Sequence, residues 1–196
     1  MSYLLRHGAK EENVKITQDG FVEETDLINW LKRQGFSVSH DMLKRIVDNC
    51  PKQRFFMERR GFTNYYRANQ GHTLSSQEVK VRMDIISNLD EFVDKPPVHG
   101  TYFKTWNVIK KDGLNRMKRQ HIHLATGDYK DRSVKSGMRS DVEVLVYIDI
   151  HKAISDGIVF YRSSNNVILT EGIDGILEPK YFLRVINTKT GEELTF

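Results

Sequence analysis

Apolar residues recur every three or four positions through residues 1–50, a spacing that is typical of amphipathic helices. One helix is predicted over residues 26–34, with Thr25 as its N-cap. A second helix is predicted to begin after Ser39, and Pro51 prevents it from continuing. The first part of the chain is therefore expected to be mainly helical.

After Pro51 the pattern changes to short runs rich in aromatic residues. Residues 54–59 and 65–68 are two such runs, and the segment between them contains Gly61. Helices followed by a β-hairpin predict a winged-helix lobe, in which the hairpin is the wing. The prediction is an analogy of fold, because winged-helix domains bind nucleic acid in some proteins and protein in others.

A second lobe is predicted after an acidic stretch that contains two prolines. Residues 88–97 include Pro96-Pro97, and we interpret them as a linker between a lobe at residues 1–87 and a lobe at residues 98–196. The strand-like runs beyond the linker are residues 98–103, 121–125, 142–150, 158–161, 166–170 and 181–186. Many short strands with few helices predict an α+β lobe on a mixed or antiparallel sheet.

Glycines mark the ends of the few helices expected in this second lobe. A helix is predicted over residues 106–112 with Gly113 as its stop, and a shorter one over residues 151–155 before Gly157.

Composition excludes several classes of protein. Hydrophobic residues make up 39% of the chain and charged residues 29%, which is ordinary for a globular protein. No apolar run approaches the ~20 residues of a membrane span, and no signal peptide is visible, so a soluble intracellular protein of the cytoplasm or nucleus is expected. Cys50 is the only cysteine, which rules out a disulfide within the chain. With a net charge of only +4, any nucleic acid must be held by a local cluster of cations.

Common nucleotide-binding and hydrolase signatures are absent from the sequence. There is no Gly-x-x-x-x-Gly-Lys-Ser/Thr loop, no Gly-x-Gly-x-x-Gly and no Gly-x-Ser-x-Gly. His121 and His123 lie two apart in a predicted strand and could face a zinc ion together. A catalytic zinc needs a third protein ligand, and none is offered nearby, so hydrogen-bonding or structural roles are favoured and no metal is expected.

Several arginines have unusual neighbours. Arg6-His7 precedes a glycine, Arg54 follows Pro51 at the start of a strand, and Arg139 follows Ser136-Gly137. Guanidinium groups bind phosphate through paired hydrogen bonds, and several that converge make a strong dianion site. Each arginine alone is more typical of a solvated or salt-bridged surface, and spacing alone does not show that they converge.

A family resemblance covers nearly the whole chain. Its motifs are Leu5-Arg6-His7, Lys52-Gln53-Arg54-Phe55, Arg67-Ala68-Asn69-Gln70-Gly71-His72, His99-Gly100-Thr101, His121-Ile122-His123-Leu124-Ala125, Ser136-Gly137-Met138-Arg139, Asn166-Val167-Ile168-Leu169-Thr170 and Pro179-Lys180-Tyr181-Phe182. Each motif is short, but in this order the set resembles the NAD-dependent RNA 2′-phosphotransferases.

The resemblance implies a fold and a reaction. The fold is a winged-helix RNA-binding lobe followed by an ADP-ribosyltransferase-like NAD-binding lobe with a mixed β-sheet. The reaction is the final step of tRNA splicing, in which the internal splice-junction 2′-phosphate of ligated tRNA is transferred to NAD. The products are RNA with a 2′-hydroxyl, nicotinamide and ADP-ribose 1″,2″-cyclic phosphate. NAD is consumed as a co-substrate, no metal or membrane is involved, and a monomer is expected.

The resemblance also implies roles for particular residues. The catalytic group maps onto Arg6, His7, Arg54 and Arg139. The residues expected to bind NAD are His99, Gly100, Thr101, His123, Ser136, Gly137, Asn166 and Ile168, the last two on one strand. The residues expected to meet RNA or its phosphates are Lys52, Arg67, Gln70 and His72.

Within the catalytic group, Arg54 and Arg139 would clamp the phosphate, while Arg6 and His7 orient it. His7 could also protonate the leaving 2′-oxygen.

One departure and two alternatives remain. Relatives have more helix before the Ser-x-x-Leu-Arg-His segment that contains the first motif and here begins at Ser2, so either the chain is part of a longer protein or its first residues are held by other contacts. The alternatives are an ADP-ribosyltransferase that caps phosphorylated nucleic-acid ends, and an inactive winged-helix RNA-binding module.

Overall fold

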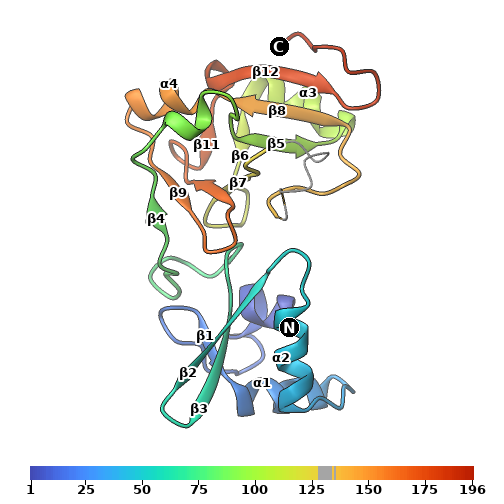
Figure 1. The fold of residues 1–196 in the computed structure, drawn as a ribbon, viewed down its shortest axis with the longest axis vertical. Helices are drawn as coiled ribbons and strands as arrows, with labels where there is room; N and C mark the ends of the chain where they lie inside the picture. Colours follow the sequence, from blue (N-terminus) through green and yellow to red (C-terminus); the bar gives the residue numbers. More distant parts are fainter. Residues whose placement is uncertain (128–133, 135) are drawn as a thin grey trace. The chain divides into compact units, whose positions relative to one another are not determined.

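A computed structural model describes residues 1–127, 134 and 136–196 of the chain. The chain divides into two compact units, Met1–Arg82 and Met83–Phe196, drawn in Figure 1. We call these the N-terminal unit and the C-terminal unit, and each is described by itself.

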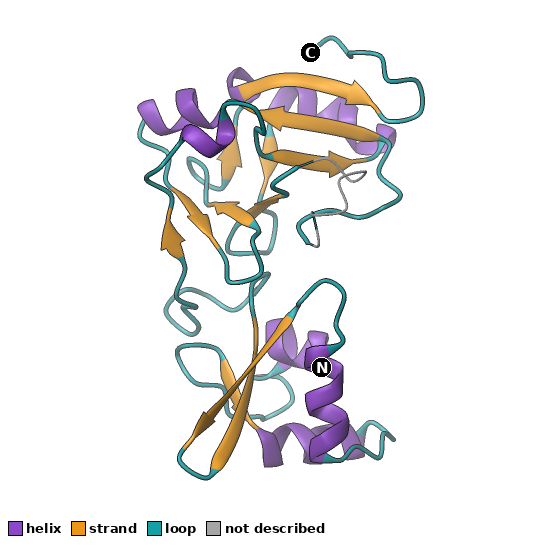
Figure 2. Ribbon diagram, viewed as in Figure 1, coloured by secondary structure: helices purple, strands orange, loops and turns teal. Residues whose placement is uncertain are grey.

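The N-terminal unit combines three helical elements with a small antiparallel sheet (Figure 2). Its elements are η1 (Leu4–Gly8), β1 (Phe21–Glu23), α1 (Glu24–Arg33), α2 (His40–Asp48), β2 (Phe55–Arg60) and β3 (Thr63–Ala68). The strand order is β1-β3-β2, so the hairpin of β2 and β3 is extended by β1.

One face of this sheet packs on the helices. Leu27 of α1, Leu43 of α2 and Val22 and Tyr66 of the sheet are fully buried in one cluster, which also includes Leu5 of η1. The first residues are therefore held in the core of the unit rather than left to fray.

The N-terminal helices and the hairpin were predicted correctly, with errors at their ends. Ser39 does cap α2, because its hydroxyl accepts a hydrogen bond from Met42 N at 3.3 Å. The prediction that Thr25 caps α1 is wrong: the helix begins at Glu24, and the N-cap position is Glu23, without a capping side chain. Strand β1 was missed because three residues are too few to show a period.

The C-terminal unit is built from short strands with two α-helices, α3 (Phe103–Asp112) and α4 (Ile150–Ser155), among the described residues. The strands are β4 (Asp84–Ile85), β5 (Val98–Thr101), β6 (Leu114–Asn115), β7 (Ile122–Leu124), β8 (Val144–Ile148), β9 (Phe160–Arg162), β10 (Ile168–Thr170), β11 (Ile176–Leu177) and β12 (Phe182–Asn187). The described part of this unit also contains two 3₁₀ turns, η2 (Asp90–Phe92) and η3 (Pro179–Tyr181).

Within the described residues, these strands form three antiparallel sheets, with orders β4-β9-β10-β7, β11-β6 and β12-β8-β5. Strand β8 lies at the centre of the last sheet and is buried on both faces. Val144 and Val146 point into the main core with Trp106 of α3, while Leu145 and Tyr147 point into a smaller cluster on the other face. In Figure 2, α3 lies behind this sheet.

The α+β class is thus confirmed. Every strand pair among the described residues is antiparallel, so the mixed sheet implied by the resemblance is not observed there, and the short edge strands were missed. Gly113 does end α3, with φ of 87°. Within the stretch interpreted as a linker, Phe92 is 4% exposed and packs into the C-terminal core. No helix in the described part of the chain is long and apolar enough to cross a bilayer.

Candidate functional site

In the N-terminal unit, Thr73 holds the Arg6-His7 motif. Its backbone N–H donates to the Arg6 carbonyl at 3.0 Å, and its hydroxyl lies 3.1 Å from His7 Nδ1. The two partners are more than sixty residues apart in sequence. Thr73 directly follows the 67–72 motif, so the first and third motifs of the resemblance meet here.

Arg54 sits at the end of a tight turn that begins at Cys50. The Gln53 N–H donates to the Cys50 carbonyl at 2.8 Å, and the Arg54 N–H and Nη1 both approach Cys50 Sγ, at 3.4 and 3.7 Å. Lys52 lies in the same turn and is half-buried. Asn69 joins this turn to the end of β3 through a hydrogen bond from its Nδ2 to the Gln53 carbonyl, 2.7 Å long.

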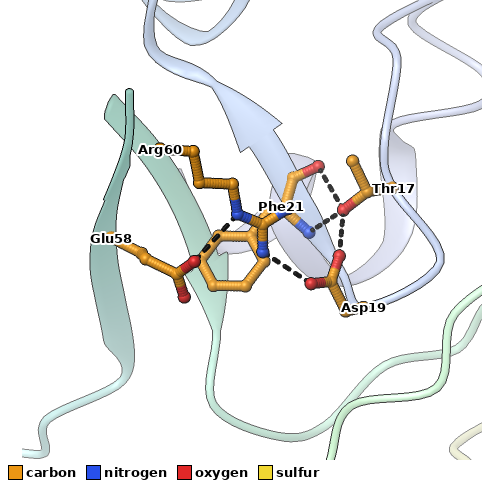
Figure 3. Close-up of polar contacts among 5 residues, drawn as sticks. All are labelled: Thr17, Asp19, Phe21, Glu58 and Arg60. Carbon is orange, nitrogen blue, oxygen red and sulfur yellow. Dashed lines mark hydrogen bonds and ion pairs between the residues drawn. The ribbon is translucent and has the colours of Figure 1, made fainter. Parts of the chain in front are cut away.

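The face of the β1-β3-β2 sheet that does not pack on the helices carries two arginines, and their surroundings differ. Arg60 donates to Asp19 at 2.6 Å and to Glu58 at 2.9 Å, and it covers the Phe21 ring with its guanidinium carbon 4.3 Å from the centroid (Figure 3). Thr17 completes the group by bonding both Asp19 and the Phe21 backbone. The charge of Arg60 is therefore balanced by its neighbours.

Arg67, on the central strand, has no carboxylate hydrogen-bonded to it among the described residues. Its guanidinium carbon lies 5.3 Å from the Phe21 ring and 5.1 Å from the Phe56 ring. Its Nε and Nη1 are buried and have no hydrogen-bond partner among the described residues. Burial, together with the positive charge of Arg60, lowers the pKa of Arg67, against a smaller opposing effect of Asp19 and Glu58. Arg67 is thus a partly desolvated cation with unused donors.

Gln70 and His72 are more buried than the sequence suggested. They are 7% and 1% exposed, so their side chains lie inside the unit rather than on its surface. Their contact with RNA stays a prediction.

In the C-terminal unit, strands β5 and β7 bring two predicted NAD-binding residues together. His99 Nδ1 lies 3.0 Å from the His123 carbonyl, and Val98 and Ala125 exchange backbone hydrogen bonds of 2.8 and 3.0 Å beside them. Thr101 is buried, and its hydroxyl is 2.7 Å from that of Thr105 in α3. His121 precedes β7, so the expectation that it shares the strand with His123 is wrong.

Two glycines let the 136–139 segment pack closely on these strands. Gly137 has φ of 97°, and a Cβ there would lie 2.8 Å from Ala125 Cα. A Cβ on Gly100 would lie 2.5 Å from Met138 Cγ and 2.7 Å from Val142 Cγ1. The space beside Gly100 is therefore filled by the protein's own side chains.

Arg139 is exposed and stands against an aromatic ring. Its Nη1 donates to the Tyr102 hydroxyl at 3.2 Å, and that hydroxyl donates to Asp141 at 3.1 Å. The hydrogen bond to Tyr102 raises the pKa of Arg139, so the group is a permanent cation.

A buried polar cluster holds Ser136. Asn165, which is 3% exposed, donates from Nδ2 to Ser136 Oγ at 3.1 Å and accepts from the Ser163 hydroxyl at 2.9 Å. The next residue, Asn166, lies in a turn with φ of 59° and accepts from Arg162 Nη1. The prediction that Asn166 shares a strand with Ile168 is wrong, because β10 begins at Ile168, whose side chain is fully buried in the main core.

Sequence comparison decides which family these residues belong to. A sequence profile of the RNA 2′-phosphotransferase, Tpt1/KptA family, matches residues 1–172. The chain belongs to this family. It is 42% identical over 192 residues to tRNA 2′-phosphotransferase 1 of Danio rerio, which covers 96% of this chain and 84% of that protein. The Homo sapiens protein of that name is 40% identical over 194 residues, covering 96% and 74%.

A further relative shows that family members differ in length. A Schizosaccharomyces pombe protein with a provisional assignment as a tRNA 2′-phosphotransferase is 44% identical over 195 residues, covering 99% of this chain and 51% of that protein. The chain therefore spans about half the length of this relative.

In this RNA 2′-phosphotransferase family member, the residues that sequence reasoning missed are the partners of the predicted ones. They are Thr73 beside Arg6 and His7, Cys50 and Asn69 beside Arg54, Tyr102 beside Arg139, and Asn165 beside Ser136. The signal in the sequence was closeness to the motifs of the family resemblance. Asn69 lies inside one of these motifs, and three other partners directly adjoin one: Thr73, Tyr102 and Asn165. In the described part of the chain, no three His, Cys, Asp or Glu side chains are grouped to hold a metal ion.

The neutral state of His99 makes stability depend on pH. Burial, aided by the charge of Arg119 and opposed by the His123 carbonyl, lowers the pKa of His99. The pKa of His99 is therefore lower in the folded chain than in the unfolded chain, where it is ~6.5, so the unfolded chain binds a proton more readily. The contribution of neutral His99 to the free energy of unfolding is present above pH ~6.5 and is lost as the pH falls towards the pKa of His99 in the folded chain. Burial also lowers the pKa of His121, so its contribution to stability depends on pH in the same direction.

We therefore expect the free energy of unfolding in urea to be smaller at pH 5.5 than at pH 7.5. His99→Gln should narrow this difference, and His151→Gln, at an exposed position on α4, should leave it unchanged. An equal difference in the wild-type and His99→Gln chains would contradict this assignment.

Proposed function

We propose that this protein transfers an internal 2′-phosphate of RNA to NAD, as in the last step of tRNA splicing, and releases nicotinamide and ADP-ribose 1″,2″-cyclic phosphate. The observation that carries the proposal is the family match over residues 1–172. The Danio rerio and Homo sapiens relatives, by their names, act on tRNA 2′-phosphates. The presence of Arg6, His7, Arg54 and Arg139 supports the catalytic part.

The two units would divide the work. The element order η1-β1-α1-α2-β2-β3 with an antiparallel hairpin supports a winged-helix RNA-binding lobe in the N-terminal unit. The antiparallel sheets of the C-terminal unit support an ADP-ribosyltransferase-like NAD-binding lobe. Fold alone does not fix either role, so both rest on the family.

The residues of the C-terminal unit fit NAD through particular groups. The Thr101 and Ser136 hydroxyls are buried and bonded within the protein, so they would support the site rather than touch the dinucleotide. The half-buried imidazoles of His99 and His123 and the main chain at Gly137 are the better candidates for direct contact.

Two displacements account for the products: the phosphate is the nucleophile in the first, and its phosphorus is attacked in the second. In the first, an oxygen of the RNA 2′-phosphate bonds to the anomeric carbon of the nicotinamide ribose, and nicotinamide leaves with the bonding electrons. The phosphate is already anionic, so no general base is required, and Arg54 and Arg139 would hold it in line. In the second, a ribose hydroxyl bonds to phosphorus and releases its proton, while the bond from phosphorus to the RNA 2′-oxygen breaks; the proton released by the attacking hydroxyl balances the one that the leaving oxygen takes up.

Charge accumulates on the phosphoryl oxygens in the second step, where paired guanidinium donors stabilise it. The leaving 2′-oxygen takes up a proton, which His7 would donate. Thr73 would fix the His7 ring orientation through its contact with Nδ1.

Product identification tests the proposal. The protein is incubated with NAD and an oligonucleotide that carries one internal 2′-phosphate, with the 2′-hydroxyl oligonucleotide as a control. We expect equal amounts of 2′-hydroxyl RNA, nicotinamide and the cyclic phosphate. ADP-ribosylated RNA that accumulates without the cyclic product would indicate a capping enzyme. No product, and no NAD binding in calorimetry, would indicate an RNA-binding module.

A further inference from the structure

We propose that Asn69 is a positioning residue that fixes Arg54 by holding the turn before it in a left-handed conformation. Its effect on phosphate transfer rests on the proposed function, whereas the geometry can be tested without it. No role was predicted for Asn69 from the sequence.

Asn69 clamps two consecutive carbonyl groups of the Arg54 turn. Its side-chain Nδ2 donates to the Gln53 carbonyl at 2.7 Å, and its backbone N–H donates to the Arg54 carbonyl at 2.9 Å. Asn69 is 5% exposed, so both bonds are shielded from water. The backbone bond continues the pairing of β2 and β3 past their end pair, Phe55 with Ala68, and does not depend on the side chain at position 69. The side-chain bond, in contrast, requires an amide of the length of asparagine.

The clamp acts where the backbone is strained. Gln53 has φ of 44°, a left-handed conformation that residues with a side chain rarely adopt. The exposed Gln53 side chain makes no hydrogen bond or ion pair among the described residues, so the strain is opposed by its two backbone bonds, to Cys50 and to Asn69. Without the Asn69 amide, the Gln53 peptide would relax and the direction of Arg54 would change.

Cys50 reports on the position of Arg54. Burial raises the pKa of the Cys50 thiol, but the Arg54 backbone N–H, its guanidinium and the Lys52 N–H outweigh this and hold the pKa below its usual value. Cys50 is the only cysteine of the chain, so alkylation by iodoacetamide as a function of pH measures this one thiol. The midpoint of this pH dependence is the pH at which half of the Cys50 thiol is ionised. If Arg54 moves away from Cys50, this midpoint must rise.

The first experiment measures this midpoint in Asn69→Ala and Asn69→Ser, neither of which reaches the Gln53 carbonyl. The matched control is Asn64→Ala, on the same strand, whose Nδ2 bonds Glu24 at 2.6 Å instead of the turn. We expect the midpoint to rise in both Asn69 variants and to stay unchanged in Asn64→Ala. An unchanged midpoint in the folded Asn69 variants would overturn the proposal.

The second experiment is a rescue at Gln53. Glycine adopts the left-handed conformation without strain, so Gln53→Gly should return the midpoint of Asn69→Ala towards the wild-type value. A general loss of folding would not be repaired by this change, and a failure to rescue would count against the positioning role.

Turnover of the 2′-phosphorylated oligonucleotide provides the functional readout. We expect kcat to fall about 10²-fold in Asn69→Ala with the KM for NAD nearly unchanged, and to recover in the double variant with Gln53→Gly. If the wild-type protein shows no phosphate transfer, the proposed function fails while the thiol measurement still decides the role of Asn69. If the midpoint rises but kcat does not fall, Asn69 does not position a catalytic group.

Discussion

Arg139→Ala should lower the turnover of a 2′-phosphorylated oligonucleotide by about 10³-fold or more while the chain stays folded. Arginines that stabilise the transition state of phosphoryl transfer contribute factors of this size. The side chain is exposed and donates a hydrogen bond to the Tyr102 hydroxyl, so its removal opens no cavity in the core. The loss should therefore appear in catalysis and not in the melting temperature.

Two further variants distinguish a catalytic role of Arg139 from an effect of its charge alone or of its packing on a tyrosine. Arg184 also stacks on a tyrosine in the C-terminal unit, with its guanidinium carbon 4.4 Å from the Tyr147 ring, and Arg184→Ala should retain wild-type turnover. Arg139→Lys keeps the charge but loses the planar fork, so an intermediate loss is expected. Near-normal turnover of Arg139→Ala would remove this residue from the mechanism.

Local signals in the sequence identified most of the fold. The helix over α2 followed from apolar spacing and from Ser39, whose hydroxyl does cap it, and the end of α3 followed from Gly113. Strand β1 and the short edge strands were missed because two or three residues carry no measurable period. The strand-like run at residues 166–170 placed Asn166 on a strand, whereas Asn166 lies in a left-handed turn, where its side chain accepts a hydrogen bond from Arg162.

Candidate site residues could be named from the sequence, whereas the residues that contact and hold them could not. The partner of His7 is Thr73, and the partner of Ser136 is Asn165, each separated from it by more than twenty-five residues. No spacing rule joins such pairs, because the sheet register and the loops between strands bring them together. The motifs identified the candidate residues, whereas their hydrogen-bond partners could be identified only from the three-dimensional structure.

Gly100 shows how the same residue supports two different readings. The family resemblance implies that Gly100, beside His99, is one of the residues that bind NAD, where the lack of a side chain would let NAD approach the backbone. In the structure, the position of its missing Cβ lies 2.5 Å from Met138 Cγ and 2.6 Å from Met138 Sδ. Gly100 therefore gives room to the side chain directly before Arg139, and its effect on activity should pass through that segment.

Gly100→Ala should lower turnover by about 10²-fold, because the new methyl group displaces Met138 and shifts Arg139 with it. The backbone at this position is not left-handed, so alanine meets no strain of its own. Adding Met138→Ala removes the Cγ and Sδ atoms but leaves Val142 Cγ1, at 2.7 Å, still to be displaced, so turnover should recover in part towards the level of the single Met138→Ala chain.

This rescue distinguishes packing from ligand contact. If Gly100 acts by admitting NAD, the methyl group blocks the dinucleotide whatever occupies position 138, and the double variant stays as inactive as Gly100→Ala with a raised KM for NAD. If Gly100 acts by seating Met138, kcat recovers in the double variant and the KM for NAD stays near the wild-type value throughout. The comparison of kcat and KM in these three variants thus assigns Gly100 either to the NAD contact or to the support of Arg139.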